Sequence, residues 1–179
     1  MPGYIALLRA INVGGRAKLP MQDLAGLFTE LGCAEVRTYI QSGNVVFEAP
    51  APVARGLDAA VPDAIEKRFG FRPPVLLRTA SQLATVLEGN PFIERGVATN
   101  LLHVAFLAAA PSKERVAALD PGRSPGDEFE VRGKEVYLHF PNGVGRTKLT
   151  NEYLDRTLGT TSTVRNWRTV ETLASMLSA

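Results

Sequence analysis

Short apolar runs with strand character alternate with helically spaced apolar residues along the first half of the chain. The apolar residues from Met21 to Leu31 recur at three- and four-residue spacing, with Pro20 before them and Gly32 after them, as at the two ends of a helix. The predicted elements are strand, helix, strand, strand, helix and strand, over 4–8, 21–31, 36–40, 45–47, 53–69 and 74–78. This order is that of the ferredoxin-like split βαβ unit.

Two local features concern the turns of this first unit. Gly43 and Asn44 separate two β-rich runs, which predicts a hairpin closed by a type II′ turn. Pro62 interrupts the predicted helix over 53–69, so it either kinks that helix or begins its second part.

The second half of the chain repeats the same order more loosely. Thr79 and Gln82 are spaced as a capping box, and Thr147 is placed to cap a helix that stops at Gly159. The predicted elements cover 79–89, 101–107, 111–119, 129–131, 136–140, 147–158, 161–164 and 166–177. We therefore predict an α+β chain of two ferredoxin-like half-repeats, 1–88 and 101–179 with a C-terminal helix, joined by a connector over 89–100. The alternative is a single mixed sheet with inserted loops.

Composition restricts the class of protein. The 179 residues are 45% apolar and 21% charged, which predicts a globular chain. A net charge of +2 argues weakly at best for nucleic-acid binding. The apolar N-terminal run is too short for a signal peptide or a membrane span, so we expect a cytoplasmic protein. Cys33 is the only cysteine, which excludes an intrachain disulfide, and we expect a buried thiol rather than a catalytic one.

The first strand runs into a glycine turn followed by two cations and a predicted helix start. Free backbone amides, a helix N-terminus and nearby Arg and Lys side chains together suit an anion. The alternative is that the glycines merely supply positive φ in a tight connection. Neither the Walker nor the dinucleotide glycine pattern is present. The candidate ligand-binding residues here are Arg9, Asn12, Gly14, Gly15, Arg16 and Lys18.

A second segment has the same arrangement of strand end, glycine turn, cation and helix start. Its candidate residues are Asn142, Gly143, Arg146 and Lys148, and the alternative is a loop with Thr147 as a cap. If the two halves bring both loops to one cleft, their cations converge there. Arg165, Asn166 and Arg168 form a further cluster at a helix start, where the helix dipole disfavours cations and an anion or carboxylate partner is indicated. Trp167 is expected in the core.

Uncharged polar groups gather in the predicted hairpin. Gln41, Ser42 and Asn44 could fix a base or a sugar, although turn chemistry also explains the last two. His103 and His139 lie in apolar strands and are expected to be core residues, because two lone histidines make no metal motif. The sequence therefore predicts no metal and no cofactor.

Four segments together resemble one family. The stretch LLRAINVGG from Leu7, TYIQSGNVVF from Thr38, the segment from Pro141 to Lys148 and RNW from Arg165 are similar to the bacterial family known as domain of unknown function 1697. This resemblance implies a duplicated ferredoxin-like α+β fold and implies no activity. Ala10 stands where the family pattern has glycine.

The sequence leaves several functions open. The leading hypothesis is a module that binds a small phosphorylated or nucleotide-like ligand. A second is RNA binding on a sheet surface, with Tyr39, Phe47, Tyr137 and Phe140 as stacking residues. An enzyme, and a structural or partner-binding protein, are the remaining alternatives. We expect a monomer or a homodimer paired through sheet edges.

Overall fold

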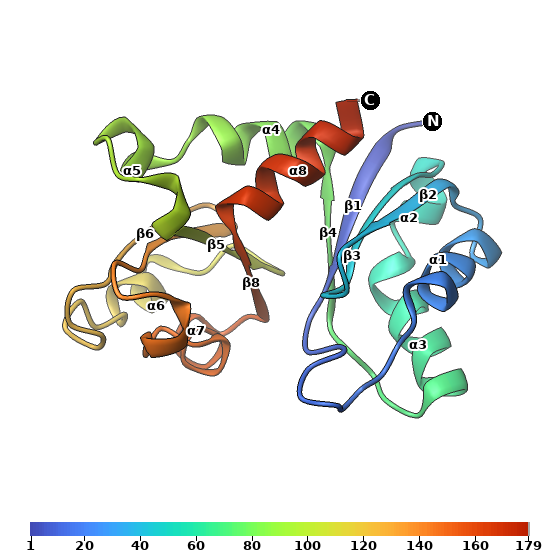
Figure 1. The fold of residues 1–179 in the computed structure, drawn as a ribbon, viewed down its shortest axis with the longest axis horizontal. Helices are drawn as coiled ribbons and strands as arrows, with labels where there is room; N and C mark the ends of the chain where they lie inside the picture. Colours follow the sequence, from blue (N-terminus) through green and yellow to red (C-terminus); the bar gives the residue numbers. More distant parts are fainter. Residues whose placement is uncertain (179) are drawn as a thin grey trace. The chain divides into compact units, whose positions relative to one another are not determined.

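The computed structural model describes residues 1–178, which fold into two compact units (Figure 1). Unit 1 contains Met1–Ala84 and the C-terminal residues from Leu173, and unit 2 contains Thr85–Thr172. Two helices, α4 (Ala80–Glu88) and α8 (Trp167–Ser178), therefore contribute residues to both units. Each unit has one four-stranded antiparallel sheet, so the chain is a mixed α+β protein, as the sequence predicted.

The sheet of unit 1 has the strand order β2-β3-β1-β4, and every neighbouring pair is antiparallel. Its strands are β1 (Gly3–Leu8), β2 (Ala34–Tyr39), β3 (Asn44–Glu48) and β4 (Val75–Thr79). The four predicted strands of this half are confirmed, because buried strands such as β1 and β3 appear in the sequence as short apolar runs.

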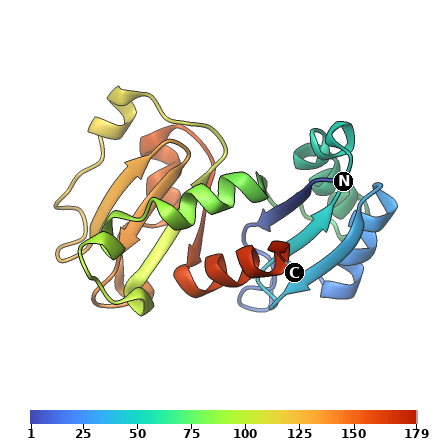
Figure 2. The ribbon, with the colours of Figure 1, turned by 90° about the horizontal axis from the view of Figure 1, so that it is seen from above.

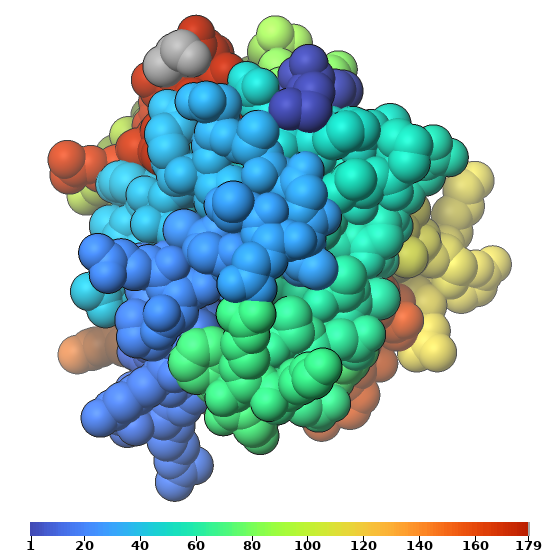
Figure 3. Space-filling model, turned by 90° about the vertical axis from the view of Figure 1, so that its right-hand side faces the viewer, coloured from blue at the N-terminus to red at the C-terminus, as the bar shows by residue number. Residues whose placement is uncertain are grey.

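Three helices cover one face of this sheet: α1 (Met21–Glu30), α2 (Ala51–Ala54) and α3 (Leu57–Phe69). Figure 3 shows this helical face, with the blue segment before α1 projecting at the lower left. The Phe28 ring of α1 contacts the Phe47 ring of β3 at a centroid separation of 5.1 Å, and Tyr4 of β1 stacks on Phe47 at 5.6 Å. The core of unit 1 lies between this helix layer and the sheet.

Pro62 lies inside α3 and is buried there, so the alternative that it begins a second helical part is wrong. The helical segment is instead divided before α3, where Gly56 occupies the N-cap position. A proline within a helix removes a single backbone donor, and here its buried ring packs in the core.

The hairpin between β2 and β3 is confirmed, but the predicted type II′ turn at Gly43 and Asn44 is wrong. Four residues, 40–43, connect the strands, and Asn44 is the fully buried first residue of β3, opposite Tyr39. Its amide donates to the Tyr39 carbonyl at 3.1 Å and to the Ser42 hydroxyl at 2.9 Å. The longer loop forms because these hydrogen bonds satisfy the buried amide.

The sheet of unit 2 has the order β6-β7-β5-β8 and is also antiparallel throughout (Figure 2). Its strands are β5 (Leu102–Leu107), β6 (Glu128–Arg132), β7 (Glu135–His139) and β8 (Ser162–Asn166). The helices within this unit are α5 (Pro91–Glu94), α6 (Lys113–Ala117) and α7 (Asn151–Leu158), with 3-10 turns at Thr99–Leu101 and Val144–Arg146.

Alternate residues of β7 serve opposite faces of this sheet. Val136 and Leu138 join the core with Leu154 of α7. Tyr137 points the other way and donates from its hydroxyl to the Val86 carbonyl of α4 at 2.9 Å. Burial raises the pKa of Tyr137 to about 12, so the phenol keeps its proton at neutral pH.

Of the two helix caps predicted for the second half, one is present in the structure and one is not. The capping box is confirmed, since Thr79 and Gln82 exchange hydrogen bonds of 2.8 and 3.1 Å at the start of α4. The cap at Thr147 is wrong: α7 begins three residues later and is capped by Thr150, whose hydroxyl accepts from the Tyr153 amide at 3.2 Å. Thr147 accepts instead from the Leu149 amide, which closes a local turn before the helix.

Ala10 adopts a left-handed backbone conformation, with φ at +61°. In this region an L-residue has a conformational energy about 1–2 kcal/mol less favourable than that of glycine. We expect Ala10→Gly to raise the free energy of unfolding by roughly 0.5–1 kcal/mol, after the greater freedom of glycine in the unfolded chain is subtracted. Urea titration followed by far-UV circular dichroism measures this change. Ala110→Gly, at an exposed position without positive φ, is the control and should destabilise; a loss of stability in Ala10→Gly of the same size would contradict the prediction.

None of the helices within residues 1–178 has the length and apolar character that crossing a membrane requires.

Candidate functional site

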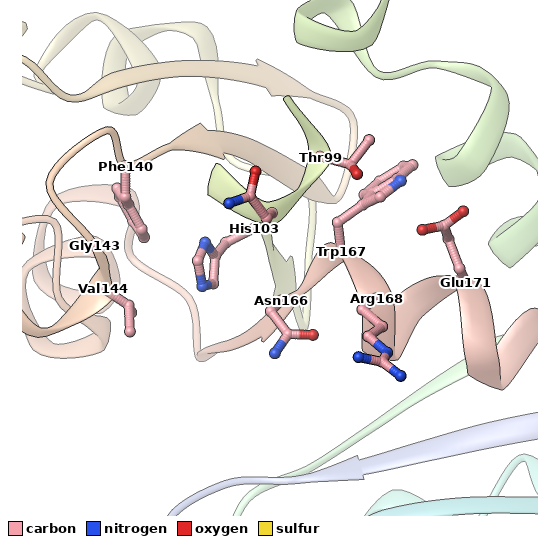
Figure 4. A pocket seen from close by; sticks show the side chains of 10 residues that line it. Thr99, His103, Phe140, Gly143, Val144, Asn166, Trp167, Arg168 and Glu171 are labelled. Carbon is pink, nitrogen blue, oxygen red and sulfur yellow. The ribbon is translucent and has the colours of Figure 1, made fainter. Parts of the chain in front are cut away.

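A cavity of about 510 Å³ lies at one end of the sheet of unit 2, where β5 begins and β7 and β8 end (Figure 4). Antiparallel pairing brings these strand ends together although they are far apart in the sequence. We call this the His103 cavity. Its lining residues are Thr99, Asn100, His103, Phe140, Gly143, Val144, Asn166, Trp167, Arg168 and Glu171.

The imidazole of His103 is the buried polar group of this cavity. Its side chain lies between Phe140 and Asn166 in Figure 4, and it contacts the Phe140 ring at a centroid distance of 5.0 Å. His103 is 9% exposed, and its Nδ1 has no hydrogen-bond partner among the described residues. Burial lowers the pKa of His103, with a smaller opposing contribution from the Leu101 backbone, so the ring is neutral at neutral pH.

The first turn of α8 forms the opposite wall. Asn166 caps the helix by accepting from the Thr169 amide at 2.8 Å through its side-chain oxygen. The amide nitrogen of Asn166 makes no hydrogen bond within residues 1–178. Helix N-termini present backbone N–H groups without intrahelical partners and a partial positive charge. Arg168 adds a full positive charge at the same place, with no partner for its guanidinium in the described chain.

The predicted cluster of Arg165, Asn166 and Arg168 does not lie together, because the side chain of Arg165 is on the opposite face of the sheet from the other two. Asn166 pairs with His103 across the strands, so the two share an end of the sheet. Arg165 precedes it in β8 and points to the opposite face, where its guanidinium donates to the Thr163 hydroxyl at 2.8 Å and the Val164 carbonyl at 3.1 Å. Burial lowers the pKa of Arg165 to about 10, which still leaves it charged at neutral pH.

The second glycine loop reaches the cavity with two residues, Gly143 and Val144. Asn142, Arg146 and Lys148 are exposed and are not among the lining residues. The backbone of Lys148 is held by Ser124, whose hydroxyl accepts from its amide at 3.0 Å. The structure therefore brings one of the four candidates of this loop to the His103 cavity.

In unit 1 the first glycine loop forms a tight turn held by a backbone hydrogen bond of its own. Gly14 and Gly15 have φ values of +59° and +75° at the tip of a turn in which the Arg16 amide donates to the Val13 carbonyl at 3.0 Å. Positive φ at both central positions is what a type I′ turn requires. The turn lies several residues before α1, so these glycines are not at the helix N-terminus as the sequence had suggested.

Asn12 joins this loop to the hairpin loop. Its amide donates to the Leu19 carbonyl at 2.9 Å and to the Gln41 carbonyl at 3.0 Å, and its oxygen accepts from the Leu19 amide at 2.7 Å. Both amide hydrogens are thus engaged inside unit 1. This arrangement gives Asn12 a clear structural role.

A second cavity, of about 590 Å³, lies beside this loop. It is lined by Asn12, Gly15, Lys18, Leu19, Pro20, Met21, Gln22 and Gln41. Lys18 and Gln41 are exposed, and the Asn12 amide is already hydrogen-bonded, so this cavity offers no buried polar group in need of a partner. The remaining unit 1 candidates do not line this cavity. The Asn44 amide donates to the Ser42 hydroxyl within the hairpin, and Arg16 is exposed. Arg9 is half-buried, and its backbone amide donates to the Pro74 carbonyl.

The residues considered for RNA stacking are mostly interior. Phe47 and Phe140 are each 1% exposed and Tyr137 is 3% exposed, while Tyr39 is half-buried. Bases stack on accessible aromatic faces, so the first three do not form a platform in this conformation. The expectations that Cys33 and Trp167 are buried are confirmed, and burial raises the pKa of the Cys33 thiol to about 11, which leaves it protonated.

Residues 1–137 match the family model described as "Protein of unknown function (DUF1697)". The chain belongs to this family. The resemblance seen in the sequence motifs is thereby confirmed. No curated protein matches the sequence. Among solved structures, the chain is similar to the conserved bacterial protein SP0830 from Streptococcus pneumoniae, at 21% identity and a TM-score of 0.73, over 100% of this chain and 99% of that one. The likeness shows a shared fold.

The DUF1697 match includes both loops of unit 1 and His103, and it ends before α8. Sequence reasoning missed Asn100, His103 and Glu171 as cavity residues. A histidine at the second position of an otherwise apolar strand was the available signal for His103, but burial alone is equally typical of a core residue. Asn100 and Glu171 carry no sequence signal, because only strand pairing and the path of α8 bring them to the cavity.

Proposed function

We propose that unit 2 binds a small anionic ligand, phosphorylated or nucleotide-like, in the His103 cavity. The observation that carries the proposal is the buried Nδ1 of His103, which has no partner among the described residues and lines a cavity that also contains Arg168. An unpartnered buried polar atom costs about 1–3 kcal/mol, and a ligand that supplies a hydrogen bond removes this penalty. The volume of about 510 Å³ is in the range of small-molecule sites.

The electrostatics of α8 support an anionic group. The helix N-terminus acts as roughly half a positive charge, and Arg168 and the amide of Asn166 lie in its first turn and at its cap. An arginine can hold a phosphate or a carboxylate with two parallel hydrogen bonds. An anion at this position would therefore receive donors from α8 on one side and from His103 on the other.

The test is binding of inorganic phosphate, adenosine monophosphate and ribose 5-phosphate to the full chain, measured by calorimetry and by the fluorescence of Trp167, the sole tryptophan. We expect at least one of these probes to bind. Arg168→Gln should weaken that binding about tenfold or more, because a hydrogen bond to a charged group contributes about 1.5–3 kcal/mol.

Matched variants locate the site. Arg146→Gln and Lys18→Gln remove exposed cations from the two glycine loops without touching the His103 cavity, and we expect them to leave the affinity unchanged. A large loss in either would place the ligand at that glycine loop, where Arg9, Arg16 and Lys148 are the neighbouring candidates. The absence of binding by all three probes would contradict a phosphorylated or nucleotide-like ligand in this cavity.

We also propose that the chain is a duplicated ferredoxin-like protein, with half-repeats near residues 1–88 and 101–179 and a connector over 89–100. Support comes from the strand orders, since β2-β3-β1-β4 and β6-β7-β5-β8 both arrange their strands as second, third, first and fourth in chain order. A cytoplasmic location, as a monomer or homodimer, completes the proposal and is testable by fractionation and light scattering.

A further inference from the structure

The His103 cavity holds one acidic and one basic side chain, both available. Arg168 and Glu171 are one helical turn apart on α8 and both line the cavity. Neither side chain has an ion-pair or hydrogen-bond partner among the described residues. Residues spaced by three on a helix are neighbours and can pair, yet here they do not: Figure 4 shows the Glu171 carboxylate on the side of the Trp167 ring and the Arg168 guanidinium extending away from Glu171.

The charge balance of the cavity follows from these two groups. His103 is neutral at neutral pH, and the other lining residues carry no charge, so the positive charge of Arg168 is matched by the negative charge of Glu171. A ligand that carried only negative charge would meet Arg168 favourably and Glu171 unfavourably. Complementarity of both signs is what disfavours wrong partners and fixes a ligand's orientation.

From this we infer that the ligand of the His103 cavity is an anionic small molecule that also carries an amino group. Its anionic group lies at Arg168 and the start of α8, and its amino group donates to the Glu171 carboxylate. The inference rests on the proposed function and adds the chemistry of the second end of the ligand. Two sources supply this chemistry: a nucleotide with an exocyclic amino group, and an α-amino acid with an aromatic body for the Trp167 and Phe140 side of the cavity.

Two pairs of probes separate these sources. Adenosine monophosphate and inosine monophosphate differ at the exocyclic amino position, and phenylalanine and phenyllactate differ by an ammonium against a hydroxyl. Affinities are measured by calorimetry on the full chain at low salt. We expect the amino-bearing member of one pair to bind about tenfold or more tightly than its partner, and the pair that shows this identifies the source.

Glu171→Gln is the decisive variant, because it keeps the shape of the side chain and removes its charge. We expect it to reduce the discrimination within the pair to about twofold or less, while binding of the amino-free member is unchanged or stronger. Glu94→Gln, an exposed glutamate of unit 2 that does not line the cavity, is the control and should retain the full discrimination.

The outcomes distinguish this inference from the proposed function. Equal binding within both pairs, tighter binding of an amino-free member, or discrimination that survives Glu171→Gln overturns the inference. If, in those cases, inorganic phosphate still binds and its binding is weakened by Arg168→Gln, the proposed function stands and only the inference about the amino group is wrong. If neither phosphate nor any of the four probes binds, both are wrong.

Discussion

Gly43→Ala is expected to lower the free energy of unfolding of unit 1 by about 3 kcal/mol. Gly43 has a φ of +84°, and a Cβ atom there would lie 2.8 Å from Leu8 Cβ and 2.9 Å from Ile11 Cδ1. Both neighbours are fully buried, so they have no room to retreat. The Gly43 carbonyl also accepts from the Leu8 amide at 2.9 Å, which prevents the loop from moving away. Left-handed strain of about 1–2 kcal/mol therefore adds to about 1–3 kcal/mol of overpacking.

Gly70→Ala is the matched control for this variant. Gly70 has nearly the same φ, +81°, but a Cβ atom at this position would meet nothing within 4 Å. We expect it to cost about 1–2 kcal/mol, from backbone strain alone. Urea denaturation followed by far-UV circular dichroism measures both changes. Equal losses in the two variants would mean that the close approach at Gly43 contributes nothing.

Asn12→Ala is expected to destabilise unit 1 by about 2–3 kcal/mol. The substitution deletes three hydrogen bonds that tie the glycine loop to Leu19 and to the hairpin loop at Gln41. It also places alanine at a φ of +54°, a conformation that asparagine tolerates better. The loss is measured by the same urea titration.

Asn12→Asp separates the contributions of the two ends of this side chain. Aspartate keeps the oxygen that accepts from the Leu19 amide but sets a charged oxygen against the Leu19 and Gln41 carbonyls in place of both donors, so a loss of stability at least as large as that of Asn12→Ala is expected. If Asn12→Ala left stability unchanged and weakened ligand binding, Asn12 would belong to a binding site rather than to the framework. This outcome would indicate that the cavity beside the glycine loop of unit 1, which Asn12 lines, is the functional site.

Much of the fold could be predicted from the chain alone. The continuous apolar run from Tyr4 to Leu8 predicts a buried strand, and the helical spacing from Met21 to Leu31 shows which side of α1 is buried. The pairing of Thr79 with Gln82 is local and follows from side-chain chemistry three residues apart. The errors at Gly43 and Thr147 are also local, and each arose where a competing hydrogen bond overrode a turn or cap preference.

The candidate site was less accessible to sequence reasoning. Asn12 and Arg168 belong to segments of similar appearance, each a polar or basic residue near a helix start. In the structure the amide of Asn12 is consumed by backbone groups of its own unit, whereas the side chain of Arg168 has no partner among residues 1–178. Residue type and spacing do not distinguish these situations, because hydrogen-bond partners come from distant parts of the chain.

The sequence by itself determined the family, the order of strands and helices and most of the core, since these depend on the periodicity of apolar residues and on short motifs. Only the tertiary structure decided which polar groups remain available for a ligand. The pairing of β5 with β8 sets His103 opposite Asn166, and the start of α8 adds Arg168 and Glu171. Antiparallel strands align their opposite ends, and this register is a property of the folded sheet.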